Sequence, residues 1–329
     1  LMHVVAPGIT DPAVLDRIIL YSRILLLQPF FLGISNLLGS YTQLKERFLL
    51  YACSPLIYNF ATVVGLIFLY PSFGITGVVV GIVIGSVLHG LIQLPFIHKE
   101  EFLPTFKAIS RREISIIKEV VQQSIPRAII LSLVQIEFLY LNSLASHMQE
   151  GSASLLNLAN NLQGVPVTLI GVSLVIASFP SLSRAHAEGE KVAFRKIFNH
   201  TFRTILLWAT AGTVGLFLCK EFIIGILLGR TSFEVQSFEH IVVTFGIFAL
   251  ALIPQCIKMF ITRGYYASGD TKKPATLNIF GTILTIGCAY LLYTYSTAPS
   301  TEVLATAFLI SSWVSCIIFY VSMKKTLLA

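Results

Sequence analysis

The sequence consists of long apolar stretches separated by short polar segments, and this pattern limits the possible folds more than any other feature. A helix needs about 20 apolar residues to cross a bilayer. Nine stretches meet this requirement, at residues 18–41, 52–70, 76–97, 114–147, 153–180, 201–219, 239–264, 275–297 and 301–323. Each stretch is continuous and longer than the strands of a membrane β-barrel. We therefore predict an all-α polytopic membrane protein with about nine transmembrane helices.

The composition supports a lipid environment and excludes several classes of function. The chain is 55% hydrophobic and 12% charged, whereas about a quarter of the residues in soluble domains are charged. The net charge of +7 does not indicate nucleic-acid binding, because the basic residues lie in short loops rather than on one face. The five cysteines lie in or at the ends of apolar spans, without metal-ligand spacing. We predict no metal site and no cofactor.

The basic residues predict the orientation in the membrane. With nine spans, the connecting segments alternate sides, and seventeen Lys and Arg residues fall on one side against four on the other. The larger set is Lys45, Arg47, Lys99, Lys107, Arg111, Arg112, Lys118, Arg184, Lys191, Arg195, Lys196, Arg203, Arg263, Lys272, Lys273, Lys324 and Lys325. The smaller set is Arg17, Arg23, Lys220 and Arg230. Because positive loops stay in the cytoplasm, we expect residue 1 outside and residue 329 in the cytoplasm.

An internal repeat predicts the domain organisation. A tyrosine-containing basic turn at 41–48 returns about 225 residues later at 264–274, and the first and last three spans share one plan. Parallel repeats of this kind build the halves of many transporters. We predict the C-terminal half of an N-lobe at 1–110 and a six-helix C-lobe at 111–329. The middle three spans lack partners, so we expect three further helices before Leu1.

One cytoplasmic link has helical amphipathicity. Residues 190–203 place Phe194, Ile197, Phe198 and Phe202 broadly on one face, with basic residues on another. This pattern is typical of an interfacial helix lying on the membrane, which we expect near 190–200. The alternative is a basic helical extension of the next span.

Three charged residues fall within the apolar spans. They are Arg127, Glu137 and Lys258, and a single Arg or Lys at the bilayer centre costs about 3 kcal/mol. A water-filled cavity or an opposite charge would offset this cost. We expect Arg127 and Lys258 to attract an anionic headgroup, and Glu137 to pair with one of them or to carry a proton. Alternatively, Lys258 reaches the cytoplasmic edge, and Arg127 and Glu137 tie helices together.

Amide side chains form a second candidate site on the fifth span. Asn157, Asn160 and Asn161 share one helical face with Gly164. In lipid, such a face must meet a cavity or another helix, so these residues contact either substrate or a neighbouring helix. Pro166 and Gly171 follow and permit a bend.

The loop at 264–274 is predicted to be a tight turn. Gly269 permits positive φ, Asp270 can cap the next helix after Thr271, and Pro274 suits a first helical turn. Arg47 occupies the matching place in the first repeat. The sequence contains no defensible catalytic constellation and no phosphate-binding glycine loop. We therefore expect a protein that is not an enzyme.

The order and spacing of several short motifs resemble one membrane protein family. They are Ser22-Arg23-Ile24; Arg47-Phe48 with Pro55 and Asn59; Gln93-Leu94-Pro95; Pro126-Arg127 with Gln135-Ile136; Pro180 to Ser183; Gly229-Arg230 to Phe233; and Lys258, Tyr266 and Gly269 to Thr271 with Pro274. Together they resemble the MurJ (MviN) family of lipid II flippases, within the multidrug/oligosaccharidyl-lipid/polysaccharide exporter superfamily.

The resemblance implies a fold, a partner and a location. The fold is a two-lobe helical bundle of the MurJ/MATE type with fourteen helices, of which the nine spans are the fourth to the twelfth. The partner is an undecaprenyl-pyrophosphate-linked peptidoglycan precursor, moved across the bacterial inner membrane for cell wall biogenesis and cell shape. A coupling ion or the membrane potential would drive transport. The chain departs from the family pattern at Asn160 and Asn161, where members usually carry an Arg, and at Leu141, where they commonly carry an Asp.

Three alternative functions remain open at this stage. The protein could flip a different lipid-linked oligosaccharide. It could be a MATE-type multidrug antiporter, although such a protein needs an acidic cavity, and here Glu137 stands against Arg127 and Lys258. The loss of the Arg at Asn161 is also compatible with a membrane scaffold that transports nothing.

Overall fold

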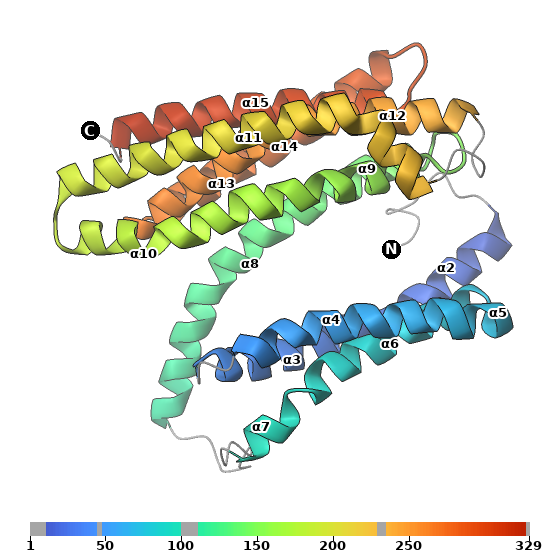
Figure 1. The fold of residues 1–329 in the computed structure, drawn as a ribbon, viewed down its shortest axis with the longest axis horizontal. Helices are drawn as coiled ribbons and strands as arrows, with labels where there is room; N and C mark the ends of the chain where they lie inside the picture. Colours follow the sequence, from blue (N-terminus) through green and yellow to red (C-terminus); the bar gives the residue numbers. More distant parts are fainter. Residues whose placement is uncertain (1–10, 45–47, 100–110, 229–234, 327–329) are drawn as a thin grey trace. The chain divides into compact units, whose positions relative to one another are not determined.

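The computed structural model describes residues 11–44, 48–99, 111–228 and 235–326. The regular secondary structure in these ranges consists of helices joined by turns (Figure 1). The chain contacts divide the described residues into two units: an N-terminal unit up to Glu113 and a C-terminal unit from Ile114. The sequence predicted the boundary between the two lobes at residues 110 and 111. Each unit is described by itself below.

The helices of the N-terminal unit follow the apolar stretches of the sequence. They are α2 (Pro12–Leu25), α3 (Leu27–Leu44), α4 (Phe48–Val64), the π-helical η1 (Gly65–Leu69), α5 (Tyr70–Phe73), α6 (Ile75–Leu91) and α7 (Leu94–Lys99). Helix α2 begins where Oδ1 of Asp11 accepts a hydrogen bond from the Ala13 amide at 2.9 Å, with Pro12 in the first turn. Because Pro29 has no N–H to donate to the preceding turn, the helix breaks at Leu26 before α3.

A glycine stripe on α6 sets the packing of the N-terminal unit. A Cβ atom on Gly81 would lie 2.8 Å from the Gly65 Cα, and one on Gly77 would lie 2.5 Å from the Leu69 carbonyl oxygen. Gly85 is equally constrained, at 2.8 Å from the Tyr58 carbonyl oxygen. Residues spaced by four share one helical face. This face therefore lets the α6 backbone approach α4 and η1 directly, the way small residues bring membrane helices together.

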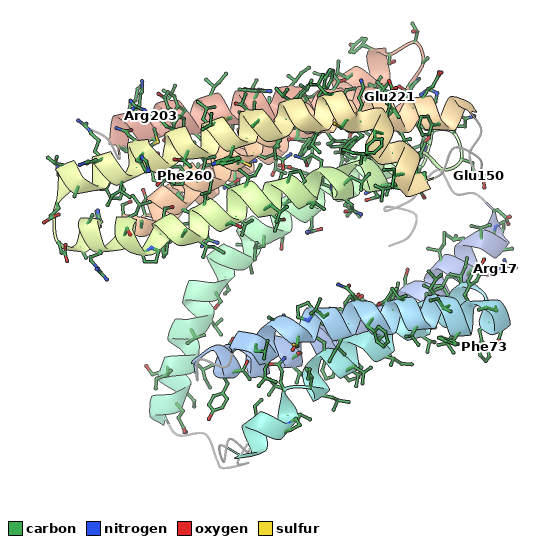
Figure 2. The ribbon with its side chains drawn as sticks, viewed as in Figure 1. Arg17, Phe73, Glu150, Arg203, Glu221 and Phe260 are labelled. Atoms are coloured by element: carbon green, nitrogen blue, oxygen red, sulfur yellow. The ribbon has the colours of Figure 1, made fainter. Side chains whose placement is uncertain are left out.

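The C-terminal unit contains the remaining helices. They are α8 (Arg111–Ala145), whose first three residues belong to the N-terminal unit, α9 (Ser152–Pro166), the π-helical η2 (Val167–Val172), α10 (Ser173–Ala187), α11 (Lys191–Leu228), α12 (Val235–Leu250), α13 (Leu252–Ala267), α14 (Lys272–Tyr295) and α15 (Thr301–Thr326). Charged side chains gather toward the two ends of this bundle, with Arg203 near one end and Glu150 and Glu221 toward the other (Figure 2).

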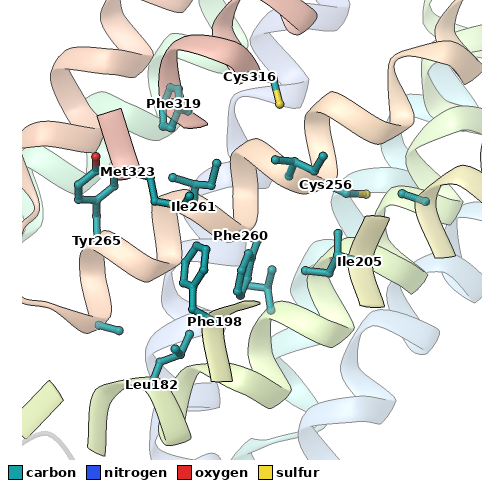
Figure 3. Close-up of a cluster of buried hydrophobic side chains, with 14 of the residues drawn as sticks. Leu182, Phe198, Ile205, Cys256, Phe260, Ile261, Tyr265, Cys316, Phe319 and Met323 are labelled. Atoms are coloured by element: carbon teal, nitrogen blue, oxygen red, sulfur yellow. The ribbon is translucent and has the colours of Figure 1, made fainter. Parts of the chain in front are cut away.

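Two apolar clusters hold the C-terminal unit together. In the first, Phe198 from α11 meets Phe260 from α13 at a ring-centroid distance of 4.5 Å, and Phe319 from α15 is buried in the same cluster (Figure 3). The second cluster joins residues from α8, α9, α11, α12, α14 and α15, and the ring centroids of Phe248 and Phe308 in it lie 5.4 Å apart. Both clusters include residues from α15, which is therefore part of the core along its length.

The region near 190–200 differs from the predicted interfacial helix. Helix α11 runs without interruption from Lys191 to Leu228, so this region is the start of a longer helix. Its aromatic residues Phe194 and Phe198 are buried in the first apolar cluster. The amphipathic pattern thus reflects packing against the neighbouring helices of the bundle, which is the alternative of a helical extension.

The described helices fall at the positions of the predicted spans. Within the described residues, seven helical segments are long and apolar enough to cross a membrane. Two shorter apolar helices, Ile75–Leu91 and Leu131–Ala145, fall in the two remaining predicted spans. The regular secondary structure of the described residues is therefore all helical, and the chain is a multi-pass membrane protein.

The glycine stripe gives the first testable prediction. The substitution Gly81→Ala should lower the apparent melting temperature of the detergent-solubilised protein, because the added methyl meets backbone rather than a movable side chain. The matched control is Gly33→Ala on α3, where nothing lies within 4 Å of the new Cβ. That control should leave the melting temperature unchanged or slightly raised, since alanine is the better helix former. Equal effects of the two substitutions would contradict the packing argument.

Candidate functional site

The C-terminal unit contains a large open cavity whose wall mixes polar and apolar residues. Its volume is about 1290 Å³, above the roughly 300–1,000 Å³ of ordinary small-molecule pockets. Helices α8, α9 and α13 and the segment η2 form most of its wall, with one residue from α14 and two from α15. The polar residues of the wall are Ser132, Gln135, Glu137, Asn142, Asn157, Asn160, Asn161, Gln163, Thr168, Gln255, Lys258, Thr262, Arg263, Tyr266, Asn278 and Ser312.

The cavity brings together most of the site residues predicted from the sequence. Glu137, Asn157, Asn160, Asn161 and Lys258 come from three helices and all line its wall. The side chain of Arg127 and the whole of Arg47 lie outside the described residues. Sequence reasoning did not assign Gln255, Arg263 and Thr282 to the site. A signal existed for the first two, since Gln255 lies three residues before Lys258 and Arg263 five residues after it on α13.

The amide face of α9 serves two purposes. Nδ2 of Asn157 donates to Oδ1 of Asn142 on α8 at 2.6 Å and to the Ala153 carbonyl at 2.8 Å. Asn157 therefore ties α9 to α8, as the interhelical alternative expects. Asn160 and Asn161 line the cavity without a recorded side-chain hydrogen bond to another described residue. Their amides are thus available to a bound molecule.

Glu137 is the one carboxylate among the described residues of the cavity wall. It is 7% exposed, and its Oε1 accepts a hydrogen bond of 2.7 Å from Oγ1 of Thr282 on α14. Within the described residues it forms no ion pair with Lys258. Among the described side chains, the partner of Glu137 is therefore the hydroxyl of Thr282, while the side chain of Arg127, the other predicted partner, is not described. This hydrogen bond offsets part of the cost of burying the carboxylate.

Helix α13 contributes the cationic part of the wall. Gln255, Lys258, Thr262 and Tyr266 follow at intervals of three or four residues, so they share one face, and Arg263 lies at its edge. The guanidinium of Arg263 lies 5.8 Å from the ring centroid of Tyr266, within the range of a cation–π contact. Among the described residues, the wall therefore has two basic side chains, Lys258 and Arg263, against one carboxylate. Such a wall attracts anions.

The turn after α13 ends that helix and begins α14. The amides of Gly269 and Asp270 donate to the carbonyls of Tyr266 and Tyr265 at 3.1 and 3.0 Å, which is the Schellman pattern of helix ends. Gly269 has φ of 79°, a value that favours glycine. Oδ1 of Asp270 accepts hydrogen bonds from the amides of Lys272 and Lys273 at 3.1 and 3.0 Å. Thr271 precedes α14, and Pro274 lies buried in its first turn.

The segment after Pro166 is π-helical where it forms part of the wall. Segment η2 spans Val167–Val172, and Val167, Thr168 and Leu169 line the cavity. A Cβ on Gly171 would lie 3.0 Å from Sγ of Cys256 on α13. The segment therefore depends on a glycine for close contact with the cationic helix. π-helical turns of this kind occur frequently at functional sites.

A multi-pass helical unit with a cavity that carries cations and amides is the arrangement found in membrane transport proteins. The comparisons with known proteins identify the family. The family model described as "Lipid II flippase MurJ" matches residues 1–329. The chain therefore belongs to the MurJ family, whose members are transporters and not enzymes.

Curated relatives and solved structures agree with this assignment. The chain is 23% identical to "Lipid II flippase MurJ" of Burkholderia cenocepacia over 85% of its own length and 55% of the relative. It is 29% identical to "Probable lipid II flippase MurJ" of Bdellovibrio bacteriovorus over 80% of its length and 49% of the relative. The chain thus spans about half the length of the curated relatives that it matches.

The solved structures establish the fold. A lipid II flippase MurJ in an inward closed conformation superposes with a TM-score of 0.80 at 20% identity, covering 98% of this chain and 66% of that one. An inward-facing MATE family multidrug resistance transporter gives the same TM-score at 16% identity, covering 93% and 70%. The bundle is therefore of the MurJ/MATE type.

The hydrogen bond between Glu137 and Thr282 yields the second prediction. The substitution Thr282→Val should destabilise the protein by about 1–3 kcal/mol, because the buried carboxylate loses its donor. In a Glu137→Leu background, the same substitution should have little effect, since no carboxylate remains to be satisfied. Apparent melting temperatures of the four proteins measure this coupling. An equal cost of Thr282→Val in both backgrounds would contradict the contact.

Proposed function

We propose that the protein translocates a lipid-linked peptidoglycan precursor, lipid II, across the bacterial inner membrane by alternating access. The observation that supports this function is the large cavity whose described wall carries two cationic side chains, one carboxylate and several amides, in a chain whose residues 1–329 match the lipid II flippase family model. A pyrophosphate-linked sugar needs cations for its phosphates and neutral polar groups for its hydroxyls and amides. The wall of the cavity supplies both kinds of group.

In this proposal, the charged and the neutral residues of the wall have different roles. Lys258, together with Arg127 on α8, attracts the pyrophosphate, while Asn160 and Asn161 contact the uncharged part of the headgroup and Asn157 holds α9 against α8. Glu137 supports α8 and α14 and is available to hold a proton or a coupling ion. The prenyl tail stays in the surrounding lipid. No covalent chemistry is needed, because exposure of one cavity to alternate sides moves the headgroup.

The domain and sidedness assignments belong to the same proposal. The N-terminal unit corresponds to the C-terminal half of an N-lobe, and the C-terminal unit corresponds to a C-lobe. Residue 1 lies outside and residue 329 in the cytoplasm. The strong bias of Lys and Arg toward one set of connecting segments supports this orientation.

A MATE-type drug antiporter has the same fold and is the main rival. Binding of cationic drugs requires acidic groups in the cavity. In the described wall, the one carboxylate, Glu137, accepts a hydrogen bond from Thr282 and is outnumbered by Lys258 and Arg263. The charge of the cavity therefore favours an anionic substrate.

Reconstitution tests the proposed function. The intact protein is placed in vesicles with fluorescent lipid II, and the accessibility of the headgroup to an external reagent is followed in time. Protein-dependent movement of lipid II supports the proposal. Movement of another lipid-linked sugar alone would indicate a different oligosaccharide flippase, and movement of no lipid would favour a scaffold.

The third prediction concerns the charge of Lys258. Hydrogen bonds to charged groups contribute about 1.5–3 kcal/mol, so Lys258→Met should weaken binding of lipid II roughly 10- to 100-fold. The matched control is Lys220→Met on α11. The Lys220 ammonium lies 4.4 Å from the ring centroid of Phe217 and is not part of the cavity wall. Binding measured in detergent should be unchanged in this control, and an equal loss in both variants would refute a specific role for Lys258.

A further inference from the structure

A second cavity lies at one end of the C-terminal unit, and it shares no lining residue with the candidate functional site. Its volume is about 470 Å³, within the range of ordinary small-molecule sites. The turn between α10 and α11, the turn after α13 and the last residue of α15 contribute its wall (Figure 1). We call it the basic pocket, after Lys191 and Arg195 in its wall.

The base of the basic pocket consists of buried side chains. Phe194 is 5% exposed and Tyr265 is 1% exposed, and both line the pocket. The hydroxyl of Tyr265 is hydrogen-bonded with Oγ of Ser322 at 2.7 Å and with Oγ1 of Thr326 at 3.1 Å, both on α15. The ring of His186, a further residue of the wall, lies edge-on to Phe194 at a centroid distance of 6.2 Å. The pocket is therefore part of the packed bundle rather than a gap between exposed side chains.

Two cations of the wall have no acidic partner among the described residues. Lys191 and Arg195 are exposed and lie about one turn apart on α11. Neither side chain forms an ion pair with another described residue. The carboxylate of the described wall, Asp270, is engaged elsewhere, because its Oδ1 accepts hydrogen bonds from the amides of Lys272 and Lys273. The pocket therefore presents two unpaired positive charges to a ligand.

The position of Lys191 is unfavourable for the helix itself. It is the first residue of the 38-residue helix α11, whose first turn contains no acidic residue. The N-terminus of a helix carries a partial positive charge, so an anion stabilises it and a cation does not. Helix stability therefore does not explain this lysine. An anion in the pocket would be attracted by Lys191, by Arg195 and by the helix terminus together.

The surroundings of the pocket favour a lipid headgroup over a soluble anion. Lys324 and Lys325 end the membrane span α15, and basic side chains at the ends of such helices reach the headgroup region. Thr326 follows them directly and lines the pocket, which therefore lies at the same level. Val192, also in the wall, is 84% exposed and offers apolar contact beside the two cations. Basic pockets between membrane helices bind anionic lipid headgroups.

We propose that the basic pocket binds the phosphate of an anionic phospholipid, with Lys191 and Arg195 paired to the phosphate oxygens and Val192 in contact with the start of an acyl chain. The guanidinium of Arg195 can bind two phosphate oxygens, while Lys191 acts as a point charge. The site is separate from the cavity assigned to lipid II, and the inference does not depend on the proposed function. Such a lipid would join the ends of α10, α11, α13 and α15 and would stabilise the unit.

Titration of the intact, delipidated protein in detergent with phosphatidylglycerol tests the proposal. Phosphatidylcholine, which has a phosphate but no net charge, is the comparison lipid. We expect phosphatidylglycerol to raise the apparent melting temperature saturably and phosphatidylcholine to have little effect. The double variant Lys191→Gln/Arg195→Gln should raise the Kd for phosphatidylglycerol about 10- to 30-fold, because two charge pairs are lost.

The matched control is the double variant Lys324→Gln/Lys325→Gln. It removes the same charge from the same end of the bundle, but neither lysine is part of the pocket wall. The control should change the Kd for phosphatidylglycerol less than about 3-fold, since only screened, longer-range attraction is lost. An equal loss in both double variants would indicate diffuse attraction to the basic end of the bundle and would overturn the proposal.

Three further results would overturn it. Equal stabilisation by phosphatidylglycerol and phosphatidylcholine would show that the charge of the lipid is not recognised. Stabilisation by inorganic phosphate or by a glutamate-rich peptide, with none by phosphatidylglycerol, would assign the pocket to a soluble anion or to a protein partner. Without lipid, Lys191→Gln/Arg195→Gln should melt at or above the temperature of the parent protein, because a cation at a helix N-terminus is removed. A lower value would show that these residues are structural.

Discussion

The structure depends on one constraint, which is that polar side chains within a bilayer must face water, a ligand or one another. The C-terminal unit places sixteen polar side chains around one cavity and leaves large apolar residues such as Leu207 and Phe222 on the outside of the bundle. Inside the bundle, Asn142 pairs with Asn157, and Thr282 satisfies Glu137. The cavity is thus a consequence of the same solvation rule that makes the rest of the chain apolar.

Sequence reasoning predicted the fold and singled out five residues that line the cavity, because both inferences follow from local rules. Apolar runs of bilayer length predict helices, and the cost of a charge in lipid singles out Lys258 and Glu137. A helical period places Asn157, Asn160 and Asn161 on one face. Glycine, aspartate and proline between two spans predict the turn at Gly269. Each of these arguments uses residues that are close in the sequence.

The remaining features depend on contacts between distant segments, which the sequence does not reveal. Glu137 and Thr282 are 145 positions apart, and no periodicity links them. The apolar side of residues 190–203 could face lipid or protein, and only the partners of Phe198 on other helices decide this. The basic pocket likewise emerges only when the ends of α10, α11, α13 and α15 are placed together.

The central claim is that the cavity of the C-terminal unit is wet while the protein spans a bilayer. The most direct test is cysteine labelling in vesicles, with the five native cysteines replaced. A membrane-impermeant thiol reagent supplied on both sides should label Thr262→Cys, on the cavity wall of α13, much faster than Leu207→Cys, which is 67% exposed on an apolar face of α11. Failure to label Thr262→Cys, or equal labelling of the two positions, would contradict the account.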